Sequence, residues 1–380
     1  MATTETADVA TAAAEAVPQE VAVPAPPARG ITIKPWVWAV IAVALVFPLL
    51  KSLVPDVVSD YRLFVISTMM IAGIAVLGLN LLTGFNGQIS LGHGAFYAVG
   101  AYTAAVLMDK VMWPDFLGGG TFPYWLAVII AAIVCFGVGY LFGLPALKLE
   151  GHYLALATFA LALAVPQFLK YKWLEGLTGG VQGIVLLKPQ PPCLDHFFSS
   201  SPTMCLPLSE DQWLYYYVLI VMIALYFIAF NILRGRNGRA MMAIRDHHMA
   251  ADTMGINSSQ YKTVTFGISA AYTGVAGALS ASAIAFVAPD SFGFFLSITL
   301  LIGLVVGGVA SLAGSIIGGV FTVIVQNSAQ ALSNFAKNDL GLPFDLSAYA
   351  VYGILLLILM YVMPLGIAGG IIMAWRRLKR

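Results

Sequence analysis

Residues 61–83 read YRLFVISTMMIAGIAVLGLNLLT, and this stretch decides the fold class. Its single charged side chain, Arg62, stands next to its start. A bilayer core of ~30 Å needs about 20 apolar residues in one helix, so the stretch has the length of one membrane crossing. We therefore predict a transmembrane helix here.

The rest of the chain has the same character. Of its 380 residues 60% are hydrophobic and 10% are charged, and the mean hydropathy is +0.88. Because an ordinary soluble domain is about a quarter charged, this composition excludes a soluble enzyme, a disordered protein and a nucleic-acid binder. The net charge of +1 provides no patch that would attract a polyanion. The composition indicates a polytopic membrane protein.

Apolar runs of spanning length follow one another along the chain. We predict an all-α, polytopic membrane helical bundle of about ten spans, and glycine breaks near 84–103 and 303–319 leave that count open by one or two. The ten runs cover residues 36–54, 61–83, 93–112, 122–147, 151–170, 213–233, 263–287, 294–310, 314–333 and 348–365.

Basic residues set the expected orientation, because they are enriched in cytoplasmic loops. With both termini inside, twelve of the 19 basic residues are cytoplasmic, so we predict an N-in/C-in topology. Loop 171–212 is then periplasmic, loop 234–262 is cytoplasmic, and residues 366–380 form a basic cytoplasmic tail. Residues 1–35 are rich in Ala, Pro, Thr and Glu and are expected to be a disordered cytoplasmic tail.

The spans lack the groups that many transporters and enzymes need. No Asp or Glu stands near the middle of a run, which disfavours proton coupling but leaves sodium coupling through backbone carbonyls open. The sequence has no G-x-x-x-x-G-K-[ST] loop and no His/Cys/Glu cluster with metal-ligand spacing. We expect no covalent chemistry and no cofactor in this chain.

A glycine-rich polar segment, LTGFNGQISLGHGAFY at 82–97, interrupts two apolar runs. Polar backbone at membrane depth must be buried in protein or face a watery cavity, as in a discontinuous helix at a permeation path. The alternatives are a plain cytoplasmic turn between two spans and, for His93, a structural hydrogen bond. The candidate residues for a substrate path are Asn86, Gln88, Ser90, His93 and Tyr97.

A second segment, residues 234–257, is basic and contains a short amphipathic pattern. Asp246 is expected to cap a helix that Gly255 ends. Its apolar face is expected to hold Met249, Ala250, Thr253 and Met254. Such a helix lies on the bilayer surface or docks into a groove of a soluble partner.

Two further patterns concern packing and cysteines. Small residues one turn apart at Gly139/Gly143, Gly303/Gly307 and Gly314/Gly318 predict close helix crossings. Cys193 and Cys205 stand in one polar loop, where a disulfide is as plausible as two free thiols if that loop faces an oxidising compartment.

Four motifs follow one another along the chain: LTGFNGQISLGH (82–93), GHYLALAT (151–158), LTGGVQGI (177–184) and GRAMMAIRDHHMAADTMGI (238–256). They resemble those of the permease subunits of branched-chain amino acid ABC importers, in the same order over roughly residues 60–365. The chain is closer to the longer of the two permease types. Residues 159–167, FALALAVPQ, depart from the family by replacing its usual charged positions with a proline.

The resemblance implies a type II ABC importer fold in the bacterial inner membrane. It implies three kinds of partner besides lipid: a second homologous permease, two cytoplasmic ATPase subunits that bind ATP, and a periplasmic protein that delivers a branched-chain or other hydrophobic amino acid. A stand-alone channel or sodium-coupled carrier is the alternative, and an assembly subunit is a weaker one. By resemblance, the ATPase coupling helix comprises Arg245, Asp246, Met249, Ala250, Ala251, Met254 and Gly255.

Overall fold

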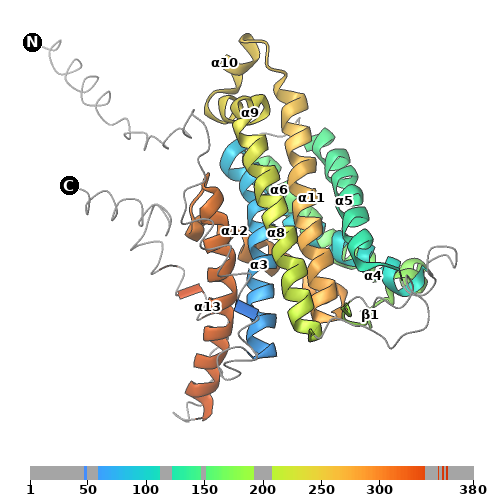
Figure 1. Cartoon of the computed structure of the whole chain (residues 1–380). Helices are drawn as coiled ribbons and strands as arrows, with labels where there is room; N and C mark the ends of the chain where they lie inside the picture. The colour runs from blue at the N-terminus through green and yellow to red at the C-terminus, as the bar shows by residue number, and fades with distance from the viewer. Residues whose placement is uncertain are drawn as a thin grey trace, which may run out of the picture. The chain divides into compact units, whose positions relative to one another are not determined.

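The computed structural model describes residues 47–48, 59–111, 122–146, 151–191 and 208–338, with single positions at 350, 353, 354 and 357. These residues form a helical bundle with one small two-stranded sheet (Figure 1). The elements are α3 (Asp60–Asn80), η2 (Leu81–Phe85), α4 (His93–Lys110), α5 (Tyr124–Ala146), α6 (His152–Leu169), η4 (Lys172–Leu174), α7 (Glu175–Thr178), β1 (Ile184–Val185), α8 (Glu210–Arg234), α9 (Arg236–Asp246), α10 (His248–Thr253), α11 (Ser258–Ile284), β2 (Phe286–Val287), η5 (Pro289–Phe292), α12 (Phe294–Gly307) and α13 (Leu312–Asn338).

The expectation of an all-α polytopic membrane protein is confirmed. In the described part of the chain six helices are long and apolar enough to cross a membrane, or seven if α6 and the following η4–α7 form one bent span. Helix α4, expected as a span, is not among them, and it ends on the charged pair Asp109 and Lys110. Runs 36–54 and 348–365 fall almost wholly outside the described residues. The total of ten spans therefore stays a prediction.

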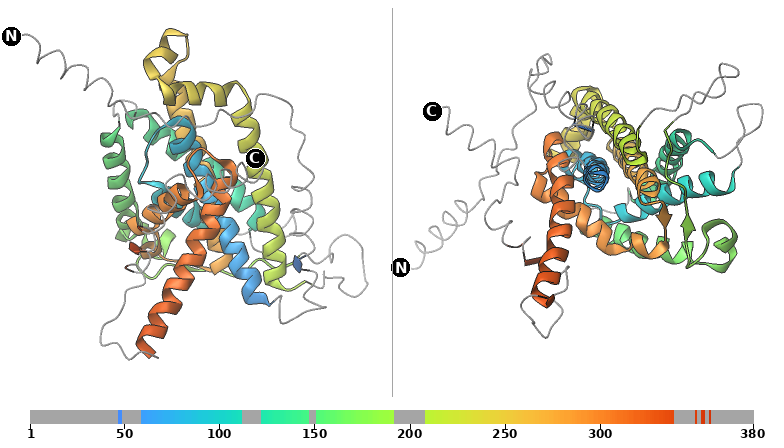
Figure 2. Two further views of the ribbon diagram at one scale, coloured as in Figure 1. Left: turned by 90° about the vertical axis from the view of Figure 1, so that its left-hand side faces the viewer. Right: turned by 60° about the horizontal axis from the view of Figure 1, so that its bottom comes forward.

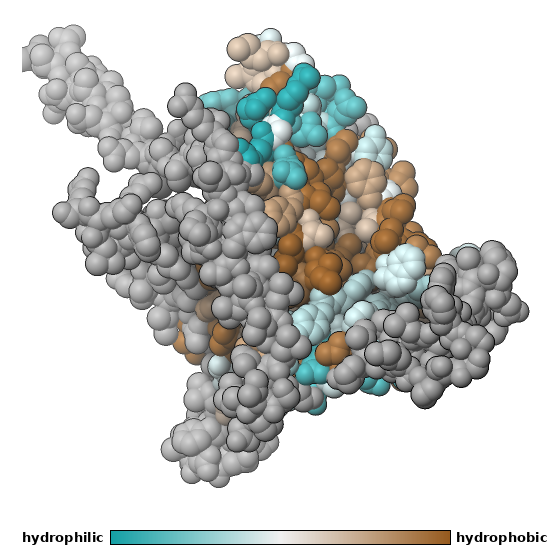
Figure 3. Space-filling model, viewed as in Figure 1, coloured by the Kyte–Doolittle hydropathy of each residue, from teal (hydrophilic) through white to brown (hydrophobic). Residues whose placement is uncertain are grey.

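Two helices form the centre of the bundle. In the most apolar windows of α3 and α11, 72% and 83% of the residues are buried, against 33% in α5 and 22% in α8. The space-filling view shows polar side chains over the end that carries α9 and apolar ones over the helices below it (Figure 3). This pattern is that of a bundle whose outer helices face lipid.

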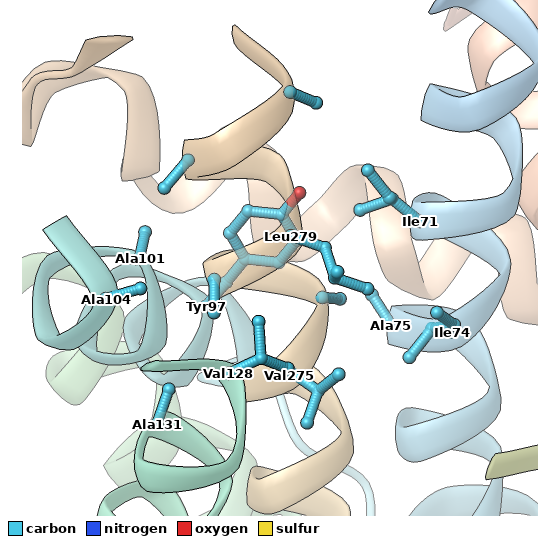
Figure 4. Packing of buried hydrophobic residues seen from close by; sticks show 14 of the residues in the cluster. Ile71, Ile74, Ala75, Tyr97, Ala101, Ala104, Val128, Ala131, Val275 and Leu279 are labelled. Atoms are coloured by element: carbon cyan, nitrogen blue, oxygen red, sulfur yellow. The ribbon is translucent and has the colours of Figure 1, made fainter. Parts of the chain in front are cut away.

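Close helix crossings depend on glycine, as the sequence predicts. A side chain at Gly100 would collide with the backbone of Gly274, which brings α4 against α11. Gly303 and Gly307 of α12 meet Gly318 and Gly314 of α13 in the same way. Dense packing of this kind lets van der Waals contact hold helices together in lipid. Small and branched side chains fill the space between α3, α4, α5 and α11 (Figure 4).

The small sheet and the α9–α10 loop lie at opposite ends of the bundle. Helix α11 begins directly after α10, and β2 follows its other end and pairs antiparallel with β1. Because α11 has 27 residues, these ends are ~40 Å apart at 1.5 Å per residue. Loops 171–191 and 235–257 thus lie on opposite sides of the spans (Figure 2). Cys193 and Cys205 lie outside the described residues.

Candidate functional site

The glycine-rich segment is a genuine break inside the fold. Helix α3 widens into a π-helical turn at Leu81–Phe85, residues 87–92 are irregular, and α4 starts at His93. The irregular part is held by the N–H of Gln88, which donates to the carbonyl of Leu82 at 3.2 Å, and by the hydroxyl of Thr83, which donates to the carbonyl of Gln88 at 3.0 Å. Residues 81–92 are therefore an internally bonded interruption between α3 and α4, and we call them the broken segment.

A chain of hydrogen bonds ties this break to α11. His93 Nδ1 lies 3.0 Å from Ser90 Oγ, and His93 Nε2 lies 2.7 Å from Ser269 Oγ. The Ser269 hydroxyl donates to the carbonyl of Gly78 at 2.6 Å, so it accepts from a protonated Nε2, and Nδ1 accepts from Ser90. All of these side chains are buried. Both ring nitrogens of His93 thus make hydrogen bonds within the fold, and its assignment to a substrate path stays a prediction.

The other candidate path residues are also enclosed by the chain. Gln88 is buried, and Tyr97 belongs to the apolar core, with its ring centroid 5.9 Å from that of Phe292. Asn86 is 2% exposed, and neither its amide nitrogen nor its amide oxygen has a hydrogen-bond partner. A buried amide without partners costs about 1–3 kcal/mol, so Asn86 is a strained point of the segment.

Asn80 is a site residue that the sequence reading missed. Its side-chain nitrogen donates to the carbonyl of Ser311 at 2.9 Å and to Ser315 Oγ at 2.7 Å, and its oxygen accepts from the N–H of Ala310 at 2.9 Å. It thus fastens the end of α3 to the turn between α12 and α13. The sequence did contain a signal for this role, because Asn80 is the one amide side chain inside the apolar run 61–83.

The boundaries predicted for the cytoplasmic helix are wrong at its start. Asp246 does not cap it, because α9 continues to Asp246 and the cap of α10 is His247. Helix α9 continues because Ala240, Met241 and Ile244 bury one of its faces. The Asp246 carboxylate instead accepts from the guanidinium of Arg245 at 2.9 Å.

The exposed face of α10 matches the prediction, with one exception. Met249 and Met254 are 70% and 84% exposed, and Ala250 and Thr253 are exposed as well. Ala251, assigned to the coupling surface, is 4% exposed and therefore faces into the loop. We call the surface formed by those four exposed residues the α10 face.

The end of α10 is shaped by Gly255 and Asp252. Gly255 has φ +81°, the left-handed conformation expected at a helix end. The Asp252 carboxylate accepts from the N–H of Ser258 at 3.3 Å, at the start of α11. Hydrogen bonds from Ser258 lower the pKa of Asp252 below its ordinary value. The carboxylate thereby stabilises the connection between α10 and α11.

 

The two candidate regions meet directly at Arg245. Its Nη1 donates a hydrogen bond to the carbonyl of Gly84 at 3.0 Å, across 161 positions of sequence. A side chain at Gly87, which has φ +74°, would lie 2.8 Å from Cγ of Arg245. Helix α9 therefore packs on the broken segment through one arginine.

Comparison with known proteins identifies the family of the chain. The family described as "Branched-chain amino acid transport system / permease component" matches residues 61–374. The chain belongs to this permease family. The match covers nearly all of the described bundle.

Two curated relatives illustrate the similarity. The permease is 31% identical over 300 residues to the high-affinity branched-chain amino acid transport system permease protein LivM of Salmonella typhimurium, covering 76% of this chain and 68% of the relative. It is 26% identical over 300 residues to LivH of the same organism, covering 77% and 89%. No solved structure matches the permease.

Proposed function

We propose that this permease is the membrane subunit of an ATP-binding cassette importer for branched-chain or other hydrophobic amino acids. A second, homologous permease completes the path, two cytoplasmic ATPase subunits bind the α9–α10 loops, and a periplasmic protein delivers the solute. The relatives named as branched-chain amino acid transport permeases support this assignment. The protein would reside in the bacterial inner membrane, with ten spans and both termini inside.

The observation that carries the proposal is the α10 face. Two methionines that are largely exposed at the end of a bundle are costly in water, and flexible Met side chains suit a groove on another protein. The same loop reaches the broken segment through Arg245 and Gly84. A partner that pushes on α10 therefore has a short route through α9 to the π-helical turn at the end of α3.

The solute path is proposed to run beside the broken segment, with Asn86 as the residue that reaches it. An amide offers both a donor and an acceptor, which suits the two charged groups of a zwitterionic amino acid. In the present conformation both of its polar atoms are unpaired. A conformational change that exposes Asn86 would remove the free-energy cost of burying an unpaired amide. It would also make this side chain available to bind the solute.

The decisive experiment changes the α10 face in the reconstituted importer. Met249→Glu and Met254→Glu place a carboxylate in the proposed groove, and Gln260→Glu places one at an exposed position of α11 as the control. We expect both methionine variants to reach the membrane but to lose ATPase binding and ATP-dependent uptake, whereas the control keeps both. ATP-independent uptake by the permease alone would instead support a channel or sodium-coupled carrier.

The topology is tested with the native cysteines. A membrane-impermeant thiol reagent, applied to intact spheroplasts after reduction, should label Cys193 or Cys205, because loop 171–212 is expected to be periplasmic. Labelling only after the membrane is broken would reverse the orientation.

A further inference from the structure

An exposed apolar surface lies at the end of the bundle opposite the α10 face. Trp173 is 82% exposed, and Val185 and Leu187 are 75% and 77% exposed. Leu177 and Val181, between them in sequence, are exposed as well. We call these five residues the outer apolar surface. Because soluble surfaces rarely leave so many large apolar side chains together in water, something covers it.

This surface is held in a fixed shape. The hydroxyl of Thr178 donates to the carbonyls of Leu169 and Leu174, both at 2.9 Å. Gly179 and Gly183 have φ of +70° and +76°, and a side chain on Gly183 would collide with the carbonyl of Val287 in β2. The loop is thus locked against the sheet, with its apolar side chains turned outward.

The side chains of β1 and of the two residues after it alternate between a buried face and an exposed face. Ile184 and Leu186 are buried in the core, whereas Val185 and Leu187 between and after them point outward. Alternation is expected in a strand, but the outward residues of a water-facing strand are polar. Here both faces are apolar, so the outer one meets a medium other than water.

The outer apolar surface continues the exposed side of α6. Leu156, Leu163 and Phe168 are exposed, so apolar side chains are accessible from the first turns of this helix to its end. At its end the chain bends by 58° into η4 and α7, where Tyr171 and Trp173 follow. Aromatic residues at the end of a span are typical of the lipid headgroup layer.

We propose that the outer apolar surface is an interfacial anchor, lying in the headgroup layer of the leaflet that faces away from the ATPases. Only the identity of that leaflet rests on the proposed function. Between Trp173 and Leu187 the sole charged residue is Glu175, so the loop offers little for the charge pairing that guides a soluble protein. A delivery protein that departs in each cycle would also leave the surface in water, whereas lipid covers it permanently.

The anchor ties the membrane surface to the bundle. Lys170, at the bend, forms an ion pair with Asp290 of η5, directly before α12. The β1–β2 pairing joins the same loop to the end of α11. An anchor attached at both points fixes the outer ends of α6, α11 and α12 relative to the bilayer while the opposite end moves.

The test measures what touches the surface in a bilayer. Trp173→Cys and Leu187→Cys are labelled with a small fluorophore in the full-length permease with Cys193 and Cys205 replaced by Ser, in lipid nanodiscs. Ser259→Cys, at an exposed position beside the α10 face, is the water-exposed control. We expect lipids with a spin label near the headgroup to quench positions 173 and 187 severalfold more than position 259, and aqueous iodide to show the opposite order.

Three results would overturn the anchor. Strong iodide quenching at 173 and 187 without lipid quenching would place them in water, and protection that appears only with the binding protein would make the surface its dock. Protection from both quenchers would indicate a permease–permease interface. The measurement needs no ATP and no ATPase, so its outcome is independent of the experiment on the α10 face.

Discussion

Arg245 donates a hydrogen bond to the carbonyl of Gly84 at 3.0 Å, and this bond joins the cytoplasmic loop to the break between α3 and α4. The same guanidinium holds Asp246 through Nε and Nη2, both at 2.9 Å. Because a guanidinium is planar and has five donors, one side chain serves both partners at fixed angles. A movement of α9 is thereby transmitted to the start of the broken segment.

Replacing Arg245 with Lys should uncouple the loop from the break. An ammonium is a point charge and cannot hold both partners in the same geometry. We expect the variant to bind ATPase normally but to show reduced ATP-driven uptake, measured side by side in proteoliposomes. Arg236→Lys, at the exposed start of α9, is the matched control. Equal uptake in both variants would exclude this route of transmission.

Gly87→Val should impair uptake for two reasons at one position. The residue has φ +74°, which a β-branched residue resists, and its added carbon would press on the stem of Arg245. We expect membrane insertion to survive and transport to fall well below that of Gly137→Val, whose added carbon meets nothing within 4 Å. Normal uptake by Gly87→Val would show that the break is only a connecting turn.

Asn80→Leu should destabilise the bundle. It removes three hydrogen bonds, so the N–H of Ala310 loses its side-chain acceptor, and Ser311 and Ser315, which also bond to each other, each lose one partner. We expect a cost of roughly 1–3 kcal/mol. The expected result is a lower Tm in detergent than for Asn231→Leu, at an exposed position of α8. An unchanged Tm would mean that the glycine crossings alone hold α13 in place.

Gly255→Val should weaken the end of α10 through its backbone alone. Gly255 has φ +81°, and no atom lies within 4 Å of an added carbon, so the cost of about 1–2 kcal/mol comes from the left-handed conformation. Gly255→Asn, which tolerates that conformation, should retain ATPase binding in a pull-down assay while Gly255→Val loses it. Equal binding by the two variants would show that the end of α10 is not part of the surface that binds the ATPase.

The sequence by itself determined the fold class and the family. Apolar runs of spanning length fix an all-α membrane bundle, because lipid forces each backbone group to bond within its own helix. The positions of the broken segment and of the α9–α10 loop were also readable, since glycines, polar residues and charges interrupt the runs. Glycines spaced one turn apart in α12 and α13 predicted close helix crossings, because this spacing is also a local pattern of the sequence.

Only the tertiary structure decided which side chains meet. The partners of Asn80 are more than 200 positions away. Arg245 meets Gly84 and His93 meets Ser269 on other helices, so no local pattern reveals these contacts. Tertiary packing likewise buries Ala251. It also makes Asp246 the end of α9, because the packing of Ala240, Met241 and Ile244 outweighs the tendency of an aspartate to cap a helix. Periodicity determines the elements, but contacts between distant segments depend on how the helices pack.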